Sequence, residues 1–307
     1  MSEDEKFMQR CIQLAKNGQQ NAKPNPMVGA VIVSADGRII GEGYHVRCGE
    51  GHAEVNAFAS VRPEDEVLLP GATMYVSLEP CSHYGKTPPC ADLIIKKRIR
   101  RVVVGCIDKF AEVQGRGIKK LQDAGIEVEV GVLEAECKAL NRRFFTFHRE
   151  QRPYIILKWA QTANGFIDDH FQPVQISSDF TKMLSHKLRA EEDAILLGRV
   201  TDERDHPQLN VREWCGPDPK RLVIDHQHPL NLDSLHAHRI QSLIVEGGAQ
   251  TLKSFLEKGL WDELRVETNL SMTVSEGTRA PQIPSEAVVV ESHKYDDNLL
   301  LTYRRNP

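Results

Sequence analysis

Short apolar segments rich in β-branched residues alternate with segments of helical spacing along the chain, and this alternation restricts the fold more than any other feature. In the first half, strands are predicted at 27–34, 38–44, 73–79, 101–106 and 126–131. Helices are predicted over 4–17, from about residue 53, over 88–98, ending near residue 125, and over 133–147. Strands separated by helices in this way predict an α/β sandwich with a largely parallel sheet.

The chain of 307 residues is longer than a usual single domain of roughly 100–200 residues, so two domains are expected. The polar run HREQRP at 148–153 interrupts the periodicity, and we place the boundary there, with a first domain at 1–147 and a second at 148–307. The second domain also alternates. Its predicted helix covers 177–191, and its predicted strands cover 154–160, 193–198, 220–225 and 241–246.

Composition and charge exclude several classes of protein. Hydrophobic residues make up 40% and charged residues 27%, which is ordinary for a globular protein, and a net charge of -4 offers no basic field for a polyanion. No apolar stretch is long enough to span a bilayer, and the N-terminal segment is typical of an amphipathic helix rather than a signal peptide. Seven cysteines without a secretory signal indicate a cytoplasmic protein, in which a cluster of Cys and His is a metal site rather than a crosslink.

One His and two Cys stand where a zinc site would need them. His52 precedes a predicted helix, Cys81 follows a predicted strand, and Cys90 lies on the next helix. Three protein ligands leave one tetrahedral position for water, as in catalytic zinc sites, whereas a structural site would need a fourth ligand such as Cys106 or His83. Glu54 is placed to take a proton from that water and pass it to a leaving amine.

The general zinc-deaminase signature is His-x-Glu followed by Pro-Cys-x-x-Cys. Here the two cysteines are separated by the longer insert SHYGKTPP. That insert, together with PNPMVG and GAVIVSADGRIIGEGYH, resembles the deaminase domain of the bifunctional riboflavin-biosynthesis deaminase-reductases, in which CSHxGxTPPC is typical. The resemblance implies a cytidine-deaminase-like α/β/α sandwich that removes the ring 2-amino group of 2,5-diamino-6-ribosylamino-4(3H)-pyrimidinone 5′-phosphate.

The same resemblance implies further substrate contacts in the first domain. Asn25 and His45 match positions that resemble ring-contacting residues, while His83 and Lys86 lie on the insert beside the metal. Lys86 would meet a phosphate or a carbonyl oxygen as a point charge. The segment IDKFAEVQGRG, which contains Asp108, departs from the family's Asp-Pro-Asn-Pro version of this loop.

The second domain carries a Gly-Gly pair, Gly247-Gly248, after an apolar strand and before a helix. Two glycines at that point let backbone amides approach a phosphate, and the helix N-terminus adds a favourable partial charge. Together with LKWAQTANG and DHPQLNVR, the closing motif VEGGAQTL resembles the family's reductase domain. The resemblance implies a dihydrofolate-reductase-like α/β domain that reduces the ribosyl group to ribityl with NADPH, and self-association as a homo-oligomer through this domain.

By resemblance, two sets of residues form the reductase site. The residues expected to face NADPH are Ala160, Thr201, Asp205, Gly248, Ala249, Gln250, Thr251 and Leu252. The residues expected to face the sugar phosphate are Lys158, Arg189, Leu209, Arg212 and Glu246.

The second domain also departs from the family pattern. The segment 226–240 is shorter than usual, Gln175 replaces a Trp, and Asn164 replaces an Asp. One alternative is therefore a deaminase with an inactive or nucleotide-sensing second domain. Another is a polynucleotide deaminase of the transfer-RNA type. The acidic net charge argues against the transfer-RNA type. The basic run KKRIRR is interpreted as a solvated helix end and so does not supply a polyanion-binding patch.

Overall fold

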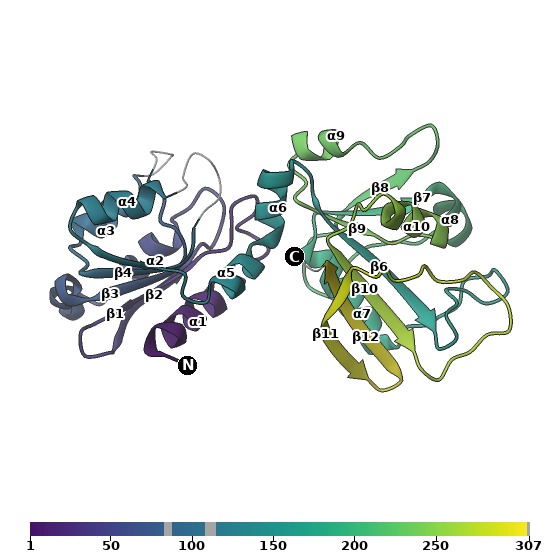
Figure 1. The fold of residues 1–307 in the computed structure, drawn as a ribbon, viewed down its shortest axis with the longest axis horizontal. Helices are drawn as coiled ribbons and strands as arrows, with labels where there is room; N and C mark the ends of the chain where they lie inside the picture. Colours follow the sequence, from purple (N-terminus) through teal and green to yellow (C-terminus); the bar gives the residue numbers. More distant parts are fainter. Residues whose placement is uncertain (83–87, 108–114, 306–307) are drawn as a thin grey trace. The chain divides into compact units, whose positions relative to one another are not determined.

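The computed structural model describes residues 1–82, 88–107 and 115–305, and the chain divides into two compact units, Met1–Glu150 and Gln151–Pro307 (Figure 1). The division falls three residues beyond the boundary expected after residue 147. Helix α6, Arg142–Glu150, continues into the polar run at 148–153, because charged side chains at a helix end are solvated and do not stop it. No helix in the described part of the chain is long and apolar enough to cross a membrane.

The first unit is built on a five-stranded sheet in the order β2-β1-β3-β4-β5. Its strands are β1 Gly29–Val33, β2 Ile39–Tyr44, β3 Thr73–Leu78, β4 Arg101–Cys106 and β5 Glu127–Val130. Its helices are α1 Glu3–Lys16, α2 Ala53–Ala59, the 3-10 helix η1 Pro63–Gly71, α3 Cys90–Lys96, α4 Arg116–Asp123, α5 Glu134–Leu140 and α6.

The expectation of a largely parallel sheet is wrong for half of this sheet. Strands β3, β4 and β5 are parallel, but β1 pairs antiparallel with both β2 and β3. A tight turn joins β1 to β2, with the Ser34 N–H donating to the Arg38 carbonyl at 2.9 Å and Gly37 at φ 83°. Two adjacent strands joined by so short a turn can pair only as an antiparallel hairpin.

Alternate residues of the strands bury opposite faces of the sheet, which confirms the expected sandwich. Ala30 and Ile32 pack with Ala57 of α2 and Ile94 of α3, whereas Val31 packs with the α1 side of the sheet. This period of two places one helical layer on each face.

The single helix expected over 133–147 is interrupted at Asn141, between α5 and α6. The Asn141 side chain is 3% exposed, and it accepts a hydrogen bond from the Met27 N–H and donates one to the Met27 carbonyl, each at 2.8 Å. A paired amide contact with a distant backbone segment cannot be read from helical periodicity.

The second unit is built on a seven-stranded sheet in the order β11-β12-β10-β6-β9-β7-β8. Its strands are β6 Tyr154–Thr162, β7 Ala194–Gly198, β8 Lys220–Ile224, β9 Ser242–Val245, β10 Glu263–Asn269, β11 Ala287–Tyr295 and β12 Asn298–Arg305. Its helices are α7 Asp179–Glu191, α8 Arg199–Asp205, α9 Leu232–Ala237 and α10 Ala249–Glu257. The sequence pattern does not predict the hairpin β11–β12. Strand β11 is exposed along almost its whole length, so it lacks the alternation of buried and exposed residues that identifies a strand.

Strands β10, β6, β9, β7 and β8 run parallel, so their carboxyl ends share one edge of the sheet. One face of this sheet packs Ile155 and Leu157 against a core that includes Leu252 and Phe255 of α10. The other face packs Ile156 against Leu188 of α7. Ligand sites of open parallel sheets form beyond the carboxyl ends of the strands, so that edge is where a reductase site belongs.

Candidate active sites

The three proposed zinc ligands lie together in the first unit. His52 is the N-cap of α2, Cys90 is the first residue of α3, and Cys81 follows β3. His52 Nδ1 lies 3.5 Å from Cys81 Sγ and 3.4 Å from Cys90 Sγ. With Zn–S of about 2.3 Å and Zn–N of about 2.0 Å, two ligands of a tetrahedral site lie about 3.5 Å apart. Both distances from His52 Nδ1 to the thiol sulfurs therefore fit a zinc ion.

The surroundings of Cys81 favour its thiolate, the form that binds metal. The hydrogen bond from the Cys90 side chain, with further contributions from His52 and the Cys90 backbone N–H, lowers the pKa of Cys81 to about 4. The Cys90 N–H lies 3.2 Å from Cys81 Sγ, where the start of α3 adds the positive end of a helix dipole.

Glu54 lies in the first turn of α2, two residues after His52, and is 3% exposed. Burial, followed by the charge of Cys81, raises the pKa of Glu54 to about 7. A bound cation acts in the opposite direction, since positive charge favours the carboxylate. A carboxyl group that titrates near neutral pH can both accept and return a proton.

The alternative of a structural zinc site with Cys106 as the fourth ligand does not fit. Cys106 packs in the core on the α1 side of the sheet, and its thiol donates to the Ser77 carbonyl at 3.5 Å. Among the described residues, the only group of His, Cys, Asp or Glu side chains with convergent metal-binding atoms is His52, Cys81 and Cys90. The other candidate, His83, lies outside the described residues, as do Lys86 and Asp108.

The predicted ring-contacting residues Asn25 and His45 lie beside the zinc ligands. The His45 ring packs edge-on against the His52 ring, with centroids 5.3 Å apart. His45 Nδ1 is 3.2 Å from the Gly51 carbonyl, which can only accept a hydrogen bond, so Nδ1 carries the proton. His45 Nε2 then accepts from the Asn25 amide at 3.1 Å, which fixes the orientation of both side chains.

Glu79 is a residue of this site that the sequence did not single out. Its carboxylate is 5% exposed and accepts hydrogen bonds from the Gly115 and Gly117 N–H groups, at 3.0 and 2.9 Å, where α4 begins. An acidic group at a helix N-terminus is stabilising. Glu79 thereby anchors the end of β3, just before the ligand Cys81, to the start of α4. The motif Glu-Pro-Cys is the one sequence signal that could have drawn attention to Glu79. Its hydrogen-bond partner Gly115 lies 36 residues further along the chain, so a local pattern cannot reveal the contact.

We predict that Gly117→Ala weakens this anchor. A Cβ at Gly117 would lie 2.0 Å from the Pro80 carbonyl oxygen, so backbone must move. The expected cost is about 1–3 kcal/mol of stability, with weaker zinc retention because Pro80 adjoins Cys81. Thermal unfolding and zinc content after dialysis against a chelator measure both effects. Gly71→Ala, where a Cβ meets nothing closer than 4.0 Å, is the matched control. Equal behaviour of the two variants would contradict the prediction.

Three of the predicted sugar-phosphate residues converge in the second unit. Glu246, which follows β9, pairs with Arg189 of α7 at 2.8 Å and with Lys158 of β6 at 3.3 Å. Although burial works against the charged form, Lys158 and Arg189 lower the pKa of Glu246. Two cations share one carboxylate, so this group of three retains a net positive charge.

The remaining two predicted residues, Leu209 and Arg212, lie on the loop after α8. Leu209 has φ 52° and is 7% exposed, and it packs against the core that contains Leu188. Arg212 Nη1 donates to Asn210 Oδ1 at 2.9 Å, while Arg189 Nη1 lies 3.5 Å from the Asn210 carbonyl oxygen. The loop is thereby held beside Arg189.

Several of the residues predicted to face the cofactor gather at the carboxyl ends of β7 and β9. The Gly248 N–H donates to Thr201 Oγ1 at 3.0 Å, and a Cβ at Gly198 would lie 2.6 Å from Thr251 Oγ1. Gly248 is the N-cap of α10, whose N-terminus has no side-chain cap, so its remaining N–H groups can bind a phosphate. This arrangement fits a phosphate group of the cofactor.

Of the other residues predicted to face NADPH, two lie at the start of α10 and the rest lie elsewhere in the second unit. Ala160 lies on β6 opposite Glu267, Asp205 ends α8 and pairs with Arg204 at 2.6 Å, and Ala249 and Gln250 begin α10. Leu252 is fully buried in the core. The short segment after β8 forms α9, and β8 is left as a sheet edge with Val223 40% exposed.

The structure explains why Asn, rather than the family's Asp, stands at position 164. The Asn164 amide donates to the Val274 carbonyl at 2.7 Å, and its Oδ1 lies 2.8 Å from Thr162 Oγ1 and 3.3 Å from the Val274 N–H. An aspartate could not donate to the carbonyl. At the other departure, the exposed Gln175 donates a side-chain hydrogen bond to the Ser177 carbonyl at 3.4 Å.

We therefore predict that Asn164→Asp destabilises the second unit by about 1–3 kcal/mol, because an unpaired carbonyl would face a carboxylate. The midpoint of urea unfolding followed by tryptophan fluorescence measures the change. Asn210→Asp, which would keep the acceptor of Arg212, is the matched control and should be close to neutral. A variant at 164 as stable as the unchanged protein would contradict the stated role of the amide.

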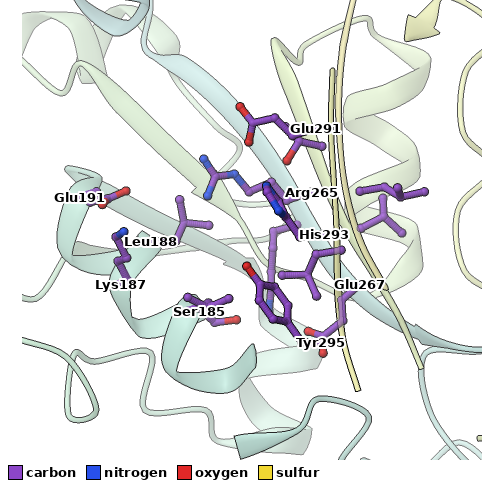
Figure 2. Close-up of a pocket in the computed structure, with 15 residues that line it drawn as sticks. Ser185, Lys187, Leu188, Glu191, Arg265, Glu267, Glu291, His293 and Tyr295 are labelled. Atoms are coloured by element: carbon purple, nitrogen blue, oxygen red, sulfur yellow. The ribbon is translucent and has the colours of Figure 1, made fainter. Parts of the chain in front are cut away.

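A pocket of about 200 Å³ lies between α7 and the strands β10, β11 and β12 (Figure 2). Arg265, Glu291, His293 and Tyr295 point into it from the sheet. Of the predicted reductase residues, only Lys158 lines this pocket. The predicted site and the pocket therefore lie side by side without coinciding.

Comparisons with known proteins identify both domains. Residues 1–106 match the family model "Cytidine and deoxycytidylate deaminase zinc-binding region", and residues 153–234 and 228–269 match "RibD C-terminal domain". Riboflavin biosynthesis protein RibD of Aquifex aeolicus is 37% identical over 86% of each chain, and that of Actinobacillus pleuropneumoniae is 42% identical over 74% of this chain and 59% of its own.

A crystal structure of a diaminohydroxyphosphoribosylaminopyrimidine deaminase/5-amino-6-(5-phosphoribosylamino)uracil reductase from Thermotoga maritima covers 99% of both chains, with a TM-score of 0.90 and 34% identity. A zinc deaminase domain followed by a reductase domain defines a bifunctional deaminase-reductase. The chain belongs to the RibD family of riboflavin biosynthesis proteins.

Proposed function

We propose that this chain catalyses two steps of riboflavin biosynthesis, with the residues identified above in the roles given below. The first step is hydrolytic deamination of 2,5-diamino-6-ribosylamino-4(3H)-pyrimidinone 5′-phosphate, and the second is NADPH-dependent reduction of the ribosyl group to ribityl. The observation that carries the proposal is the cluster of His52, Cys81 and Cys90 beside the buried Glu54, in a chain whose fold matches a deaminase-reductase over 99% of its length.

In the deamination, His52, Cys81 and Cys90 would hold the zinc ion. When bound, zinc would lower the pKa of a water molecule to about 7, which makes hydroxide available near neutral pH. Glu54 is placed to accept a proton and to return it to the amino group, which leaves as ammonia as oxygen from water replaces it on the ring carbon. Asn25 and His45, fixed by their mutual hydrogen bond, orient the ring.

In the reduction, NADPH supplies the hydride. Thr201, Gly248 and Thr251 surround the N-terminus of α10, which binds the cofactor's phosphates. Lys158, Arg189 and Arg212 bind the substrate phosphate and hydroxyl groups, and Glu246 sets the positions of the first two cations. Bidentate guanidinium contacts suit a phosphate group.

The alternative of a deaminase with an inactive second domain is not favoured, because the reductase-domain match extends through the short segment 226–240. We also propose that the partner is a small phosphorylated pyrimidine rather than a polynucleotide, since the net charge of -4 gives no general attraction to a polyanion. The two thiol ligands require a reducing compartment, which is consistent with a cytoplasmic protein.

The test follows ammonia release and NADPH oxidation together. The zinc-loaded full chain is incubated with the diamino ribosylaminopyrimidinone phosphate and NADPH. Ammonia should appear first, and NADPH should be consumed only as deaminated product forms. Supplying that product directly should restore NADPH oxidation in a Glu54→Gln variant.

Each contrary result has a separate meaning. Ammonia without NADPH oxidation would contradict the reductase assignment alone. No ammonia from the unchanged protein would contradict the substrate assignment of the first unit. NADPH consumption that does not depend on the deaminated product would contradict the proposed order of the two steps.

A further inference from the structure

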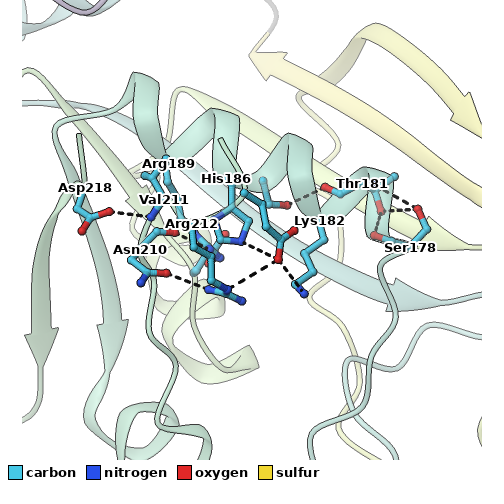
Figure 3. A network of polar contacts seen from close by, with 12 residues as sticks. Ser178, Thr181, Lys182, His186, Arg189, Asn210, Val211, Arg212 and Asp218 are labelled. Carbon is cyan, nitrogen blue, oxygen red and sulfur yellow. Dashed lines mark hydrogen bonds and ion pairs between the residues drawn. The ribbon is translucent and has the colours of Figure 1, made fainter. Parts of the chain in front are cut away.

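One face of α7 carries three basic or titratable residues directed at the loop after α8. Lys182, His186 and Arg189 are spaced four and three residues apart, which places them on the same side of the helix. Figure 3 shows this face meeting Asn210 and Arg212 of that loop. The next residue of the loop, Glu213, lies within 4.0 Å of Lys182 and His186. The function proposed above assigns Arg189 and Arg212 to the sugar phosphate but gives no role to His186 or Glu213.

The carboxylate of Glu213 is the centre of this contact. Glu213 Oε1 lies 3.0 Å from Lys182 Nζ, 3.7 Å from Arg212 Nε and 3.8 Å from His186 Nε2. The hydrogen bond from Lys182 lowers the pKa of Glu213, so the carboxylate is charged at neutral pH. Lys182 and Glu213 are partly exposed to solvent and pair with each other, whereas the neighbouring His186 ring is buried.

His186 is completely buried, with 0% of its surface exposed. Neither of its ring nitrogens has a hydrogen-bond partner of good geometry among the described residues, and the same is true of Arg189 Nε. These are three of the six buried side-chain nitrogen and oxygen atoms in the described structure that lack such a hydrogen bond. Buried polar atoms are normally paired, so such a concentration indicates a site that a polar ligand completes.

The imidazole is suited to a position among cations. Burial and the charges of Arg189 and Arg212 lower the pKa of His186. The ring is therefore neutral at neutral pH and does not repel either guanidinium group. Along α7 the ring lies between Lys182, which pairs with Glu213, and Arg189, and its Nε2 is 3.8 Å from Glu213 Oε1.

We propose that His186 is a positioning residue for the sugar-phosphate site of the reductase domain, which keeps Glu213 away from Arg189 and so leaves that guanidinium group available to the substrate phosphate. The inference rests on the proposed function of the second unit. Without the ring, Glu213, which already lies 3.7 Å from Arg212 Nε, closes on Arg189 as well and competes with the phosphate.

The test uses the full-length chain with His186→Leu, which removes the polar ring atoms and shortens the side chain, and His186→Asn, which restores a donor and an acceptor. KM for the deaminated substrate should rise about tenfold in His186→Leu, because Glu213 would then compete with the phosphate for Arg189. The KM for NADPH and kcat should remain nearly unchanged. His186→Asn should recover part of the loss.

The double variant His186→Leu/Glu213→Gln separates competition from simple damage. If the carboxylate competes with phosphate, removing its charge should restore much of the substrate KM. His238→Leu, the same substitution at an exposed histidine, is the matched control and should leave both KM values unchanged. Thermal unfolding identifies any variant that fails to fold.

Binding of ribose 5-phosphate, measured by calorimetry, provides a readout that does not need turnover. Unchanged binding and KM in His186→Leu, a parallel rise in the KM for NADPH, or no recovery in the double variant would each overturn the inference. If the unchanged protein fails to oxidise NADPH but binds ribose 5-phosphate in a manner sensitive to His186, the reductase assignment fails and the positioning role stands. Absence of that binding in the unchanged protein overturns both.

Discussion

Replacing Glu54 with Gln should lower kcat for ammonia release by about 10²–10⁴-fold, the range expected when a general acid–base group is removed. Gln has nearly the shape of Glu but cannot accept and return a proton. The zinc ligands His52, Cys81 and Cys90 are untouched, so zinc content should not change. Ammonia release under saturating substrate, with zinc measured on the same samples, tests the prediction.

The matched control is Glu64→Gln, the same substitution at an exposed carboxylate of the first unit. It should leave kcat and zinc content unchanged. A Glu54→Gln enzyme that retains more than about a tenth of the activity would show that another group carries the proton. Loss of zinc together with activity would instead mean that Glu54 supports the metal, contrary to the role assigned here.

Replacing Glu246 with Ala should abolish measurable reductase activity and destabilise the second unit. Without the carboxylate, Lys158 and Arg189 face each other as uncompensated charges. We expect a loss of about 3 kcal/mol in the free energy of unfolding, the lower end for breaking a buried pair, because the three side chains keep 12–16% exposure. Misplaced cations should lower NADPH oxidation by at least about a hundredfold, while ammonia release by the first unit continues.

The pH dependence provides an internal check on this second prediction. The pKa of Glu246 is lowered in the folded protein from the ordinary value of 4.5. Its charge therefore contributes full stability above about 4.5 and progressively less as pH falls through the folded pKa. The difference between the unchanged protein and Glu246→Ala should accordingly shrink in acid. Urea unfolding at neutral and acid pH measures it, and a constant difference would contradict the ion-pair explanation.

Glu246→Gln is the control for shape. It retains the volume and a hydrogen-bond acceptor but not the charge, so its stability should lie between those of Glu246→Ala and the unchanged protein. If Gln and the native Glu gave equal stability and equal reductase activity, the charge of Glu246 would have no role in positioning Lys158 and Arg189.

The sequence by itself determined the chemistry of the first site and the class of fold. His52, Glu54 and Cys90 lie in the first turns of helices or at their caps, and Cys81 follows a strand, so short local patterns fix their positions. The structure brings the side chains of the three predicted ligands together. The family was also recognised correctly, because its motifs are short and continuous in this chain.

The tertiary structure alone decided the features that depend on distant segments. The antiparallel pairing of β1 with β3, the helix break at Asn141, and the contact of Glu79 with α4 each join residues far apart in the chain. The network around His186 is of the same kind, since Glu213 approaches it from another loop. Local periodicity reports which face of an element is apolar, whereas pairing partners and buried polar contacts are set by how the elements pack.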